Sequence, residues 1–203
     1  MKEDKKRKVR GQGGFTLIEL VLVIAVLGIV ISLMVTNLGG GADVSARGLR
    51  VIDADSKIRN SWALFGVGTG VPRSDMTGSN PGIANSNNAM DMIVCGRDYV
   101  ATAYQDDYDR AGIRQMSEIM KIVTAPTASS SGSYTCEGYP VTASADSNNI
   151  TVQFQKVPSE VVEYVYNKRT SSTFNAATAV TTGTVQYSAV SGGSHTLTLV
   201  HPH

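Results

Sequence analysis

The acidic run at positions 106–109, Asp-Asp-Tyr-Asp, is the part of this sequence that comes nearest to a metal site. Closely spaced carboxylate oxygens are ligands that Ca²⁺ prefers. Counted from the second aspartate, a calcium loop would place Gly112 at its sixth position and Glu118 at its last. Ala111 interrupts the ligand pattern, and Glu118 falls inside a helical pattern. We therefore interpret the run as a solvated acidic turn and predict no bound metal.

The patterns of common active sites are absent from the sequence. There is no Gly-x-Ser-x-Gly, no His-Glu-x-x-His and no glycine loop ending in Gly-Lys-Ser or Gly-Lys-Thr. Serine and threonine are plentiful, but no pattern sets a base beside one of them. His195, His201 and His203 lie near the C-terminal end, where side chains often have no function. We predict no enzymatic activity, no catalytic residue and no cofactor.

Glu19 is the single charged residue between Phe15 and Leu38. A carboxylate in a membrane span costs several kcal/mol and usually has a defined partner. If the chain were cut between Gly14 and Phe15, the new α-ammonium would lie four residues before Glu19. Glu19 could then neutralise the ammonium of a neighbouring chain and fix the axial offset between them. A register error would leave a buried charge unpaired, at a cost of about 3–5 kcal/mol.

Residues 15–38 read as one apolar helix. At about 1.5 Å per residue it extends about 36 Å, enough to cross a hydrocarbon core of about 30 Å. Residues 1–14 carry a net charge of +4 and the remainder −3, within a total of +1. This order predicts a cytoplasmic leader and a translocated remainder. A plain single-span anchor leaves Glu19 unexplained, and a cleaved secretory signal has a shorter apolar region.

Residues 13–20, Gly-Gly-Phe-Thr-Leu-Ile-Glu-Leu, follow the basic leader and begin the apolar segment. In this context they resemble the class III signal of type IV pilins and type II secretion pseudopilins. The resemblance is confined to the N-terminal part of the chain. It implies cleavage after Gly14 by a prepilin peptidase, N-methylation of Phe15, and an assembly role for Glu19. The length of the leader favours the type IVb group.

The resemblance implies a structural subunit of a type IV pilus. Such a subunit sits in the bacterial inner membrane before it joins a helical surface filament of identical or related pilins. The alternatives are a type II secretion pseudopilin, a minor pilin acting as tip, initiator or DNA receptor, and a membrane-anchored periplasmic enzyme. The charge of −3 after cleavage argues against nucleic acid as a partner, and no small-molecule substrate is expected.

The segment 39–66 changes from apolar to amphipathic and is expected to continue the helix. Four large side chains recur on one helical face and should pack on a globular head, residues 67–203. These side chains are Val51, Ile58, Trp62 and Phe65. The segment begins with Gly39, Gly40 and Gly41, which each cost about 1 kcal/mol in a helix and would let it bend. By resemblance, the fold is α+β: a long helix against an antiparallel sheet.

Several elements of the head can be predicted from its patterns. Residues 90–94 form a short apolar run, and 111–124 reads as a helix with Ile113, Met116, Met120 and Val123 on one face. The predicted strands are 139–143, 150–157, and a hairpin of 184–190 with 195–200 across Ser-Gly-Gly-Ser. Residues 158–166 fit either a helix or a strand.

The chain has two cysteines, Cys95 and Cys136, both in the part predicted to lie outside the cytoplasm. An even count in an oxidising compartment favours one disulfide. It would close a loop of about 40 residues and contribute about 3–4 kcal/mol in the chain-entropy picture. Two separate buried thiols or a metal pair are the alternatives, although two cysteines without nearby histidine make a poor zinc site.

Overall fold

The computed structural model describes residues 17–70, 89–113, 116, 119–127, 130–146 and 148–202. Within the first helix, the side chains of Glu19 and of residues 30–40 lie outside this description. The chain divides into two compact units, residues 1–42 and 43–203. The described residues contain helices and one antiparallel sheet, which confirms the predicted α+β class.

The first element is a long helix, α1 (Leu17–Thr69). Its helical assignment continues through Gly39, Gly40 and Gly41. The bending that we expect at these three glycines stays a prediction. The helix is followed by Gly70, which has a left-handed φ of 66°. Glycine adopts this conformation readily, and it commonly ends helices.

The head is built on a six-stranded sheet in which every neighbouring pair is antiparallel, in the order β1-β2-β3-β4-β6-β5. The strands are β1 (Lys121–Thr124), β2 (Ser133–Cys136), β3 (Tyr139–Ala145), β4 (Asn149–Pro158), β5 (Val185–Tyr187) and β6 (Ser194–Pro202). Alternate residues of the longer strands are buried, as expected for a sheet with one covered face. The two edge strands, β1 and β5, are also short, with four and three residues.

The C-terminal hairpin is confirmed by the pairing of β5 with β6, in which Val185 faces Leu199. Gly192 and Gly193 at the β6 turn have φ values of 58° and 78°. Two successive positive φ angles fit the tight turn that matches strand twist, and glycine adopts them without steric cost. The two consecutive glycines are therefore sufficient to locate this turn from the sequence.

The core of the head lies between the sheet and the second half of α1. All four side chains of the predicted stripe, from Val51 to Phe65, are at most 1% exposed. They belong to one buried cluster with sheet residues such as Val152, Phe154 and Leu197. The helical spacing of large apolar residues thus correctly identifies the packed face of α1.

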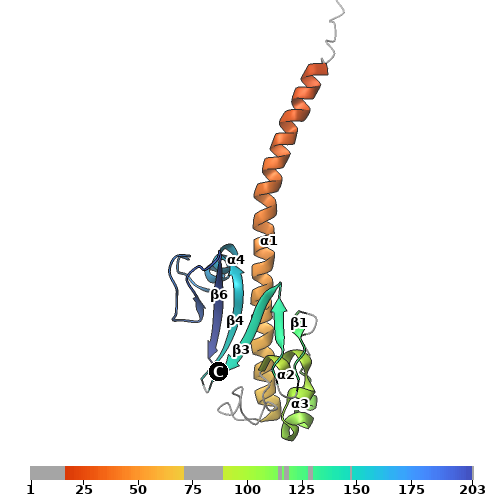
Figure 1. Cartoon of the computed structure of the whole chain (residues 1–203), viewed down its shortest axis with the longest axis vertical. Helices are drawn as coiled ribbons and strands as arrows, with labels where there is room; N and C mark the ends of the chain where they lie inside the picture. Colours follow the sequence, from red (N-terminus) through yellow and green to blue (C-terminus); the bar gives the residue numbers. More distant parts are fainter. Residues whose placement is uncertain are drawn as a thin grey trace, which may run out of the picture. The chain divides into compact units, whose positions relative to one another are not determined.

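Three further helices complete the head: α2 (Ala89–Cys95), α3 (Gln105–Ala111) and α4 (Ser159–Arg169). Two short 3₁₀ helices, Arg97–Tyr99 and Thr102–Tyr104, join α2 to α3. Figure 1 shows α2 and α3 beside the last turns of α1, and α4 next to β4 and β6. The apolar run at 90–94 forms part of α2, and the ambiguous segment 158–166 is helical from Ser159.

The helix predicted over 111–124 is wrong. Helix α3 ends at Ala111, where Gly112 caps it in the left-handed conformation, with φ at 64°. Residues Lys121–Thr124 instead pair with β2 as the edge strand β1. Ile113, Met116 and Met120 are buried as expected, but Val123 is 60% exposed. The spacing therefore identifies three of the four predicted buried positions and assigns the segment to the wrong element, since three β-branched residues in succession favour a strand.

Gly48 marks a close approach between α1 and α4. A Cβ atom built on Gly48 would overlap the Tyr164 ring, whereas one built on Gly41 meets no atom within 4 Å. Gly48→Ala is therefore expected to lower the free energy of unfolding by about 1–3 kcal/mol, because the two helices must separate. Urea unfolding followed by the fluorescence of Trp62, the single tryptophan, measures this change.

Gly41→Ala is the matched control on the same helix. Alanine is favoured over glycine in helices by about 1 kcal/mol, so this variant should be at least as stable as the parent. Equal stability of the two variants would contradict the close packing of α1 on α4.

Candidate functional site

The predicted N-terminal site begins outside the described residues, which exclude Gly14 and Phe15. Glu19 lies in α1, and its side chain is also outside the description. Around it, α1 exposes a series of large apolar side chains, each between 47% and 81% exposed. These are Leu17, Ile18, Leu20, Val21, Leu22, Val23, Ile24, Val26, Leu27 and Ile29.

The membrane-crossing helix is predicted over residues 15–38, and the structure describes only part of this range. Among the residues that the structure describes, none of the helices combines the length and the apolar character that a membrane crossing requires.

A buried carboxylate, Asp55, joins three elements of the head. It lies on the core side of α1, is 0% exposed, and forms an ion pair with Arg169 at the end of α4, with 2.8 Å between Nη2 and Oδ2. Nε2 of His201 on β6 lies 2.8 Å from the other carboxylate oxygen, Oδ1. Both oxygens thus have a polar partner, which is what makes burial of a charge tolerable. The cluster ties α1 and α4 to the C-terminal strand.

A second buried carboxylate, Asp91 of α2, holds the β1–β2 connection. Its Oδ1 accepts hydrogen bonds from the Gly132 backbone N–H, at 2.8 Å, and from the Tyr134 hydroxyl. Burial, followed by the hydrogen bond to Asp91, raises the pKa of Tyr134 strongly, so this phenol stays protonated. The group serves to position α2 against β2.

The structure differs from the predicted disulfide, because Cys95 and Cys136 are not joined. Cys95 Sγ instead lies 3.6 Å from the hydroxyl oxygen of Tyr134, which comes two residues before Cys136 on β2. Burial raises the pKa of the Cys95 thiol and raises that of Cys136 to about 11. Both thiols therefore stay protonated near neutral pH and are poor nucleophiles.

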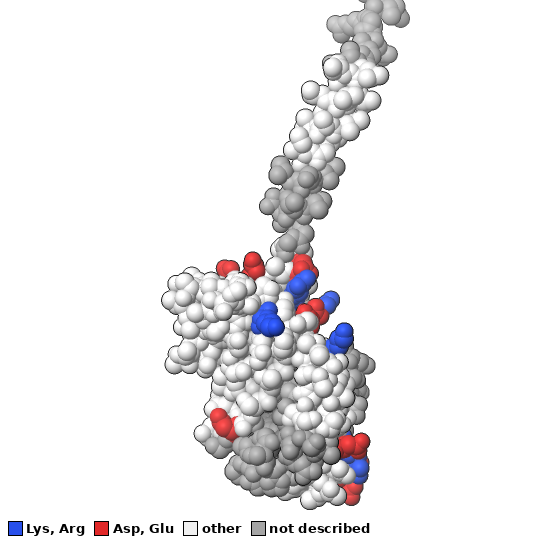
Figure 2. All heavy atoms as spheres, in the orientation of Figure 1, with Lys and Arg blue, Asp and Glu red and all other residues white. Residues whose placement is uncertain are grey.

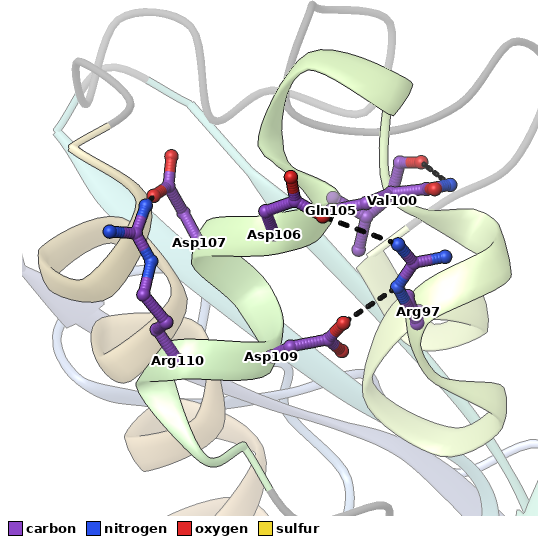
Figure 3. Close-up of polar contacts among 7 residues, drawn as sticks. All are labelled: Arg97, Val100, Gln105, Asp106, Asp107, Asp109 and Arg110. Carbon is purple, nitrogen blue, oxygen red and sulfur yellow. Dashed lines mark hydrogen bonds and ion pairs between the residues drawn. The ribbon is translucent and has the colours of Figure 1, made fainter.

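The acidic run at 106–109 is held by arginine side chains, as Figure 3 shows. Arg97 Nε lies 2.8 Å from Asp109 Oδ2, and its Nη2 lies 3.5 Å from Asp106 Oδ1. Arg110 pairs with Asp107. The hydrogen bond to Asp109 raises the pKa of Arg97 above its usual value. Within the described ranges, no group of three or more histidine, cysteine or acidic side chains could hold a metal ion.

Several charges on the described surface of the head lie in mixed pairs. On α1, Arg47 pairs with Asp43 and Lys57 with Asp53, at 2.9 and 3.0 Å, while Arg50 reaches Glu137 at 2.7 Å. Figure 2 shows basic and acidic side chains next to one another on the face that it draws. Paired charges of this kind give little of the unscreened positive potential that binding of a nucleic-acid backbone needs.

Ser159 and His195 form a contact that the sequence analysis does not predict. Ser159 is the first residue of α4, and its Oγ lies 2.9 Å from Nε2 of His195 on β6. The other ring nitrogen, Nδ1, lies 2.7 Å from the backbone oxygen of Ser188. The two residues are 36 positions apart, so only the pairing of β4 with β6 brings them together.

Comparison with known families identifies the N-terminal segment. Residues 9–35 match the prokaryotic N-terminal methylation motif, which is the class III prepilin signal of type IV pilins and pseudopilins. The match includes Gly14, Phe15 and Glu19 and leaves the head uncovered. No curated protein and no solved structure shows significant similarity to the chain.

Proposed function

We propose that this chain is the precursor of a structural subunit of a type IV pilus. The observation that carries the proposal is the methylation motif at residues 9–35. In this proposal, a prepilin peptidase removes residues 1–14 and Phe15 becomes N-methylated. The subunit resides in the bacterial inner membrane before assembly and then joins a helical surface filament, with the head displayed outside the cell.

The exposed apolar side chains of α1 support assembly with other pilins. Large apolar side chains from Leu17 to Ile29 are open to solvent in the single chain. Soluble monomers rarely expose a continuous apolar surface of this kind, which indicates an interaction with lipid or protein. Packing of α1 helices from several subunits would cover it, and each fully buried leucine, isoleucine or valine contributes about 1.5–3 kcal/mol.

The internal contacts of the head support a structural role in the filament. Its buried carboxylates, Asp55 and Asp91, make hydrogen bonds that join secondary-structure elements to one another. The arrangement suits a compact body that is displayed on a filament. A pseudopilin would share the same N-terminal signal and the same processing, and would differ in where the assembled protein is found.

The maturation step is tested by intact mass and N-terminal sequencing of protein sheared from the cell surface. We expect a chain that begins at N-methylated Phe15. Gly14→Val should block cleavage, because a branched side chain would stand at a cut site that requires a small residue. Gly11→Val, three residues further from the cut, is the control and should be processed normally.

The same experiment separates the alternatives. A chain that begins at Met1 would support a plain membrane anchor. One that begins near Arg47, after the small residues of Val44-Ser45-Ala46, would support a secreted protein. Either result overturns the proposal. A processed subunit that stays in the cell envelope and is absent from sheared filaments would favour the pseudopilin.

A further inference from the structure

The contact between Ser159 and His195 has the geometry of a hydroxyl beside its general base. Nδ1 of His195 lies 2.7 Å from the Ser188 backbone oxygen. A carbonyl oxygen accepts hydrogen bonds only, so Nδ1 must donate its hydrogen, and in the neutral imidazole the lone pair is then on Nε2. Ser159 Oγ lies 2.9 Å from this atom and donates to it. The Ser188 carbonyl thus selects the tautomer in which His195 can accept the serine proton.

The imidazole ring of His195 is held by its surroundings. The residue is 2% exposed, and its ring meets those of Phe174 and Tyr187 edge-on, at centroid distances of 5.7 and 5.9 Å. Ser159 is half-buried, so this residue is less enclosed than His195. A fixed base within hydrogen-bond distance of the hydroxyl of a partly exposed residue is the arrangement that nucleophilic catalysis requires, because it avoids reorganisation during the reaction.

Ser159 also lies where a developing negative charge would be stabilised. Strand β4 passes directly into α4, an eleven-residue helix that begins at Ser159. The N-terminal amides of a helix have no partner within it, and here the residue before Ser159 provides no side-chain cap. These amides and the helix dipole favour an oxyanion formed at the serine. The exposed carboxylate of Glu160 on the same turn disfavours anionic substrates.

We propose that Ser159 is a nucleophile that accepts acyl groups from uncharged carboxylic esters, with His195 as its general base. In the step, Ser159 Oγ forms a bond to the carbonyl carbon of the ester, and the bond from that carbon to the leaving oxygen breaks. The serine proton moves to Nε2 of His195 and then to the departing alcohol. The products are the acyl-serine and a free alcohol, so no oxidant or further reactant is needed.

The proposal is tested by exposing the full-length chain in mild detergent to p-nitrophenyl acetate and stopping the reaction with acid. Peptide mass mapping then gives the rate of acetylation at each serine. We expect Ser159 to be acetylated at least about a hundredfold faster than Ser191, an exposed serine in the same chain. His195→Phe keeps an aromatic ring in the cluster and should lower the rate at Ser159 by about 10²–10⁴-fold.

Ser194→Ala is the matched control, since it removes the hydroxyl next to His195 that bonds to the Ser191 carbonyl. It should leave acetylation of Ser159 unchanged. Trp62 fluorescence establishes that each variant is folded. Equal rates at Ser159 and Ser191 in the folded parent chain would overturn the proposal, as would an undiminished rate in folded His195→Phe. Neither result would bear on filament assembly.

Discussion

Replacement of Asp55 by alanine is expected to lower the free energy of unfolding of the head by about 3 kcal/mol, the lower end of the range for a broken buried ion pair. The change leaves Arg169 and His201 without the carboxylate that they share. Removal of one member of a buried ion pair costs about 3–5 kcal/mol, because the remaining charge stays buried without a partner. We expect the lower end because the Arg169 side chain is 23% exposed and retains some contact with water.

Asp53→Ala is the matched control for this prediction. Asp53 lies on the same helix and pairs with Lys57 at 3.0 Å, but both side chains are about half exposed. Exposed pairs at this spacing contribute about 0.3–0.5 kcal/mol. Urea unfolding of the parent and both variants, followed by Trp62 fluorescence, compares the two sites. If Asp55→Ala cost no more than Asp53→Ala, the buried cluster would not stabilise the head.

Glu19→Ala is expected to abolish filaments while leaving a stable and correctly processed subunit. In the proposed filament, the Glu19 carboxylate neutralises the N-terminal ammonium of a neighbouring subunit. Its loss would leave that ammonium in an apolar environment at a cost of about 3–5 kcal/mol per subunit. A loss of about 3 kcal/mol corresponds to a roughly hundredfold weaker association. The amount of subunit in sheared surface fractions, relative to the amount in whole cells, measures the effect.

Leu20→Ala is the control for the neighbouring position. Leu20 is 57% exposed in the single chain, so this change removes apolar contact area without removing a charge. It should weaken assembly less than Glu19→Ala does. Filaments of normal abundance from Glu19→Ala would show that Glu19 does not set the register between subunits.

Patterns that repeat along the chain allow much of the fold to be predicted. The apolar stripe from Val51 to Phe65 identifies the packed face of α1, because one helical face must be buried against the sheet. The glycine pair at 192–193 locates the β6 turn, because its backbone conformation excludes most other residues. In each case a local physical requirement determines which residues can be present.

Strands β1 and β2 escape prediction for the opposite reason. Each has only four residues. All four residues of β1 are exposed, and the alternation of β2 is limited to two buried residues, Tyr134 and Cys136, which is a weak signal for a strand. Their pairing depends on contacts with partners elsewhere in the sheet. The helix pattern that begins at Ala111 therefore outweighs the strand signal.

The polar contacts of the head cannot be predicted from sequence because they join distant residues. Asp55 and His201 are 146 positions apart, and nothing near either residue indicates the other. His201 lies close to the end of the chain, where side chains often have no function, yet β6 extends to Pro202 and places the ring on the buried side. The N-terminal motif can be recognised because its residues are consecutive.

The lengths of the two edge strands of the sheet, β1 and β5, affect how closely many heads can be packed without aggregating. A filament holds many copies of the same sheet at high local concentration, where unpaired backbone groups on one copy can join those of another. In this head, β5 offers three residues and β1 four, with an irregular register between Ile122 and Thr124. Edge strands this short present few unpaired backbone groups with which the sheet of another head could form hydrogen bonds. In the proposed filament, neighbouring heads would therefore touch repeatedly without merging into an amyloid-like ribbon.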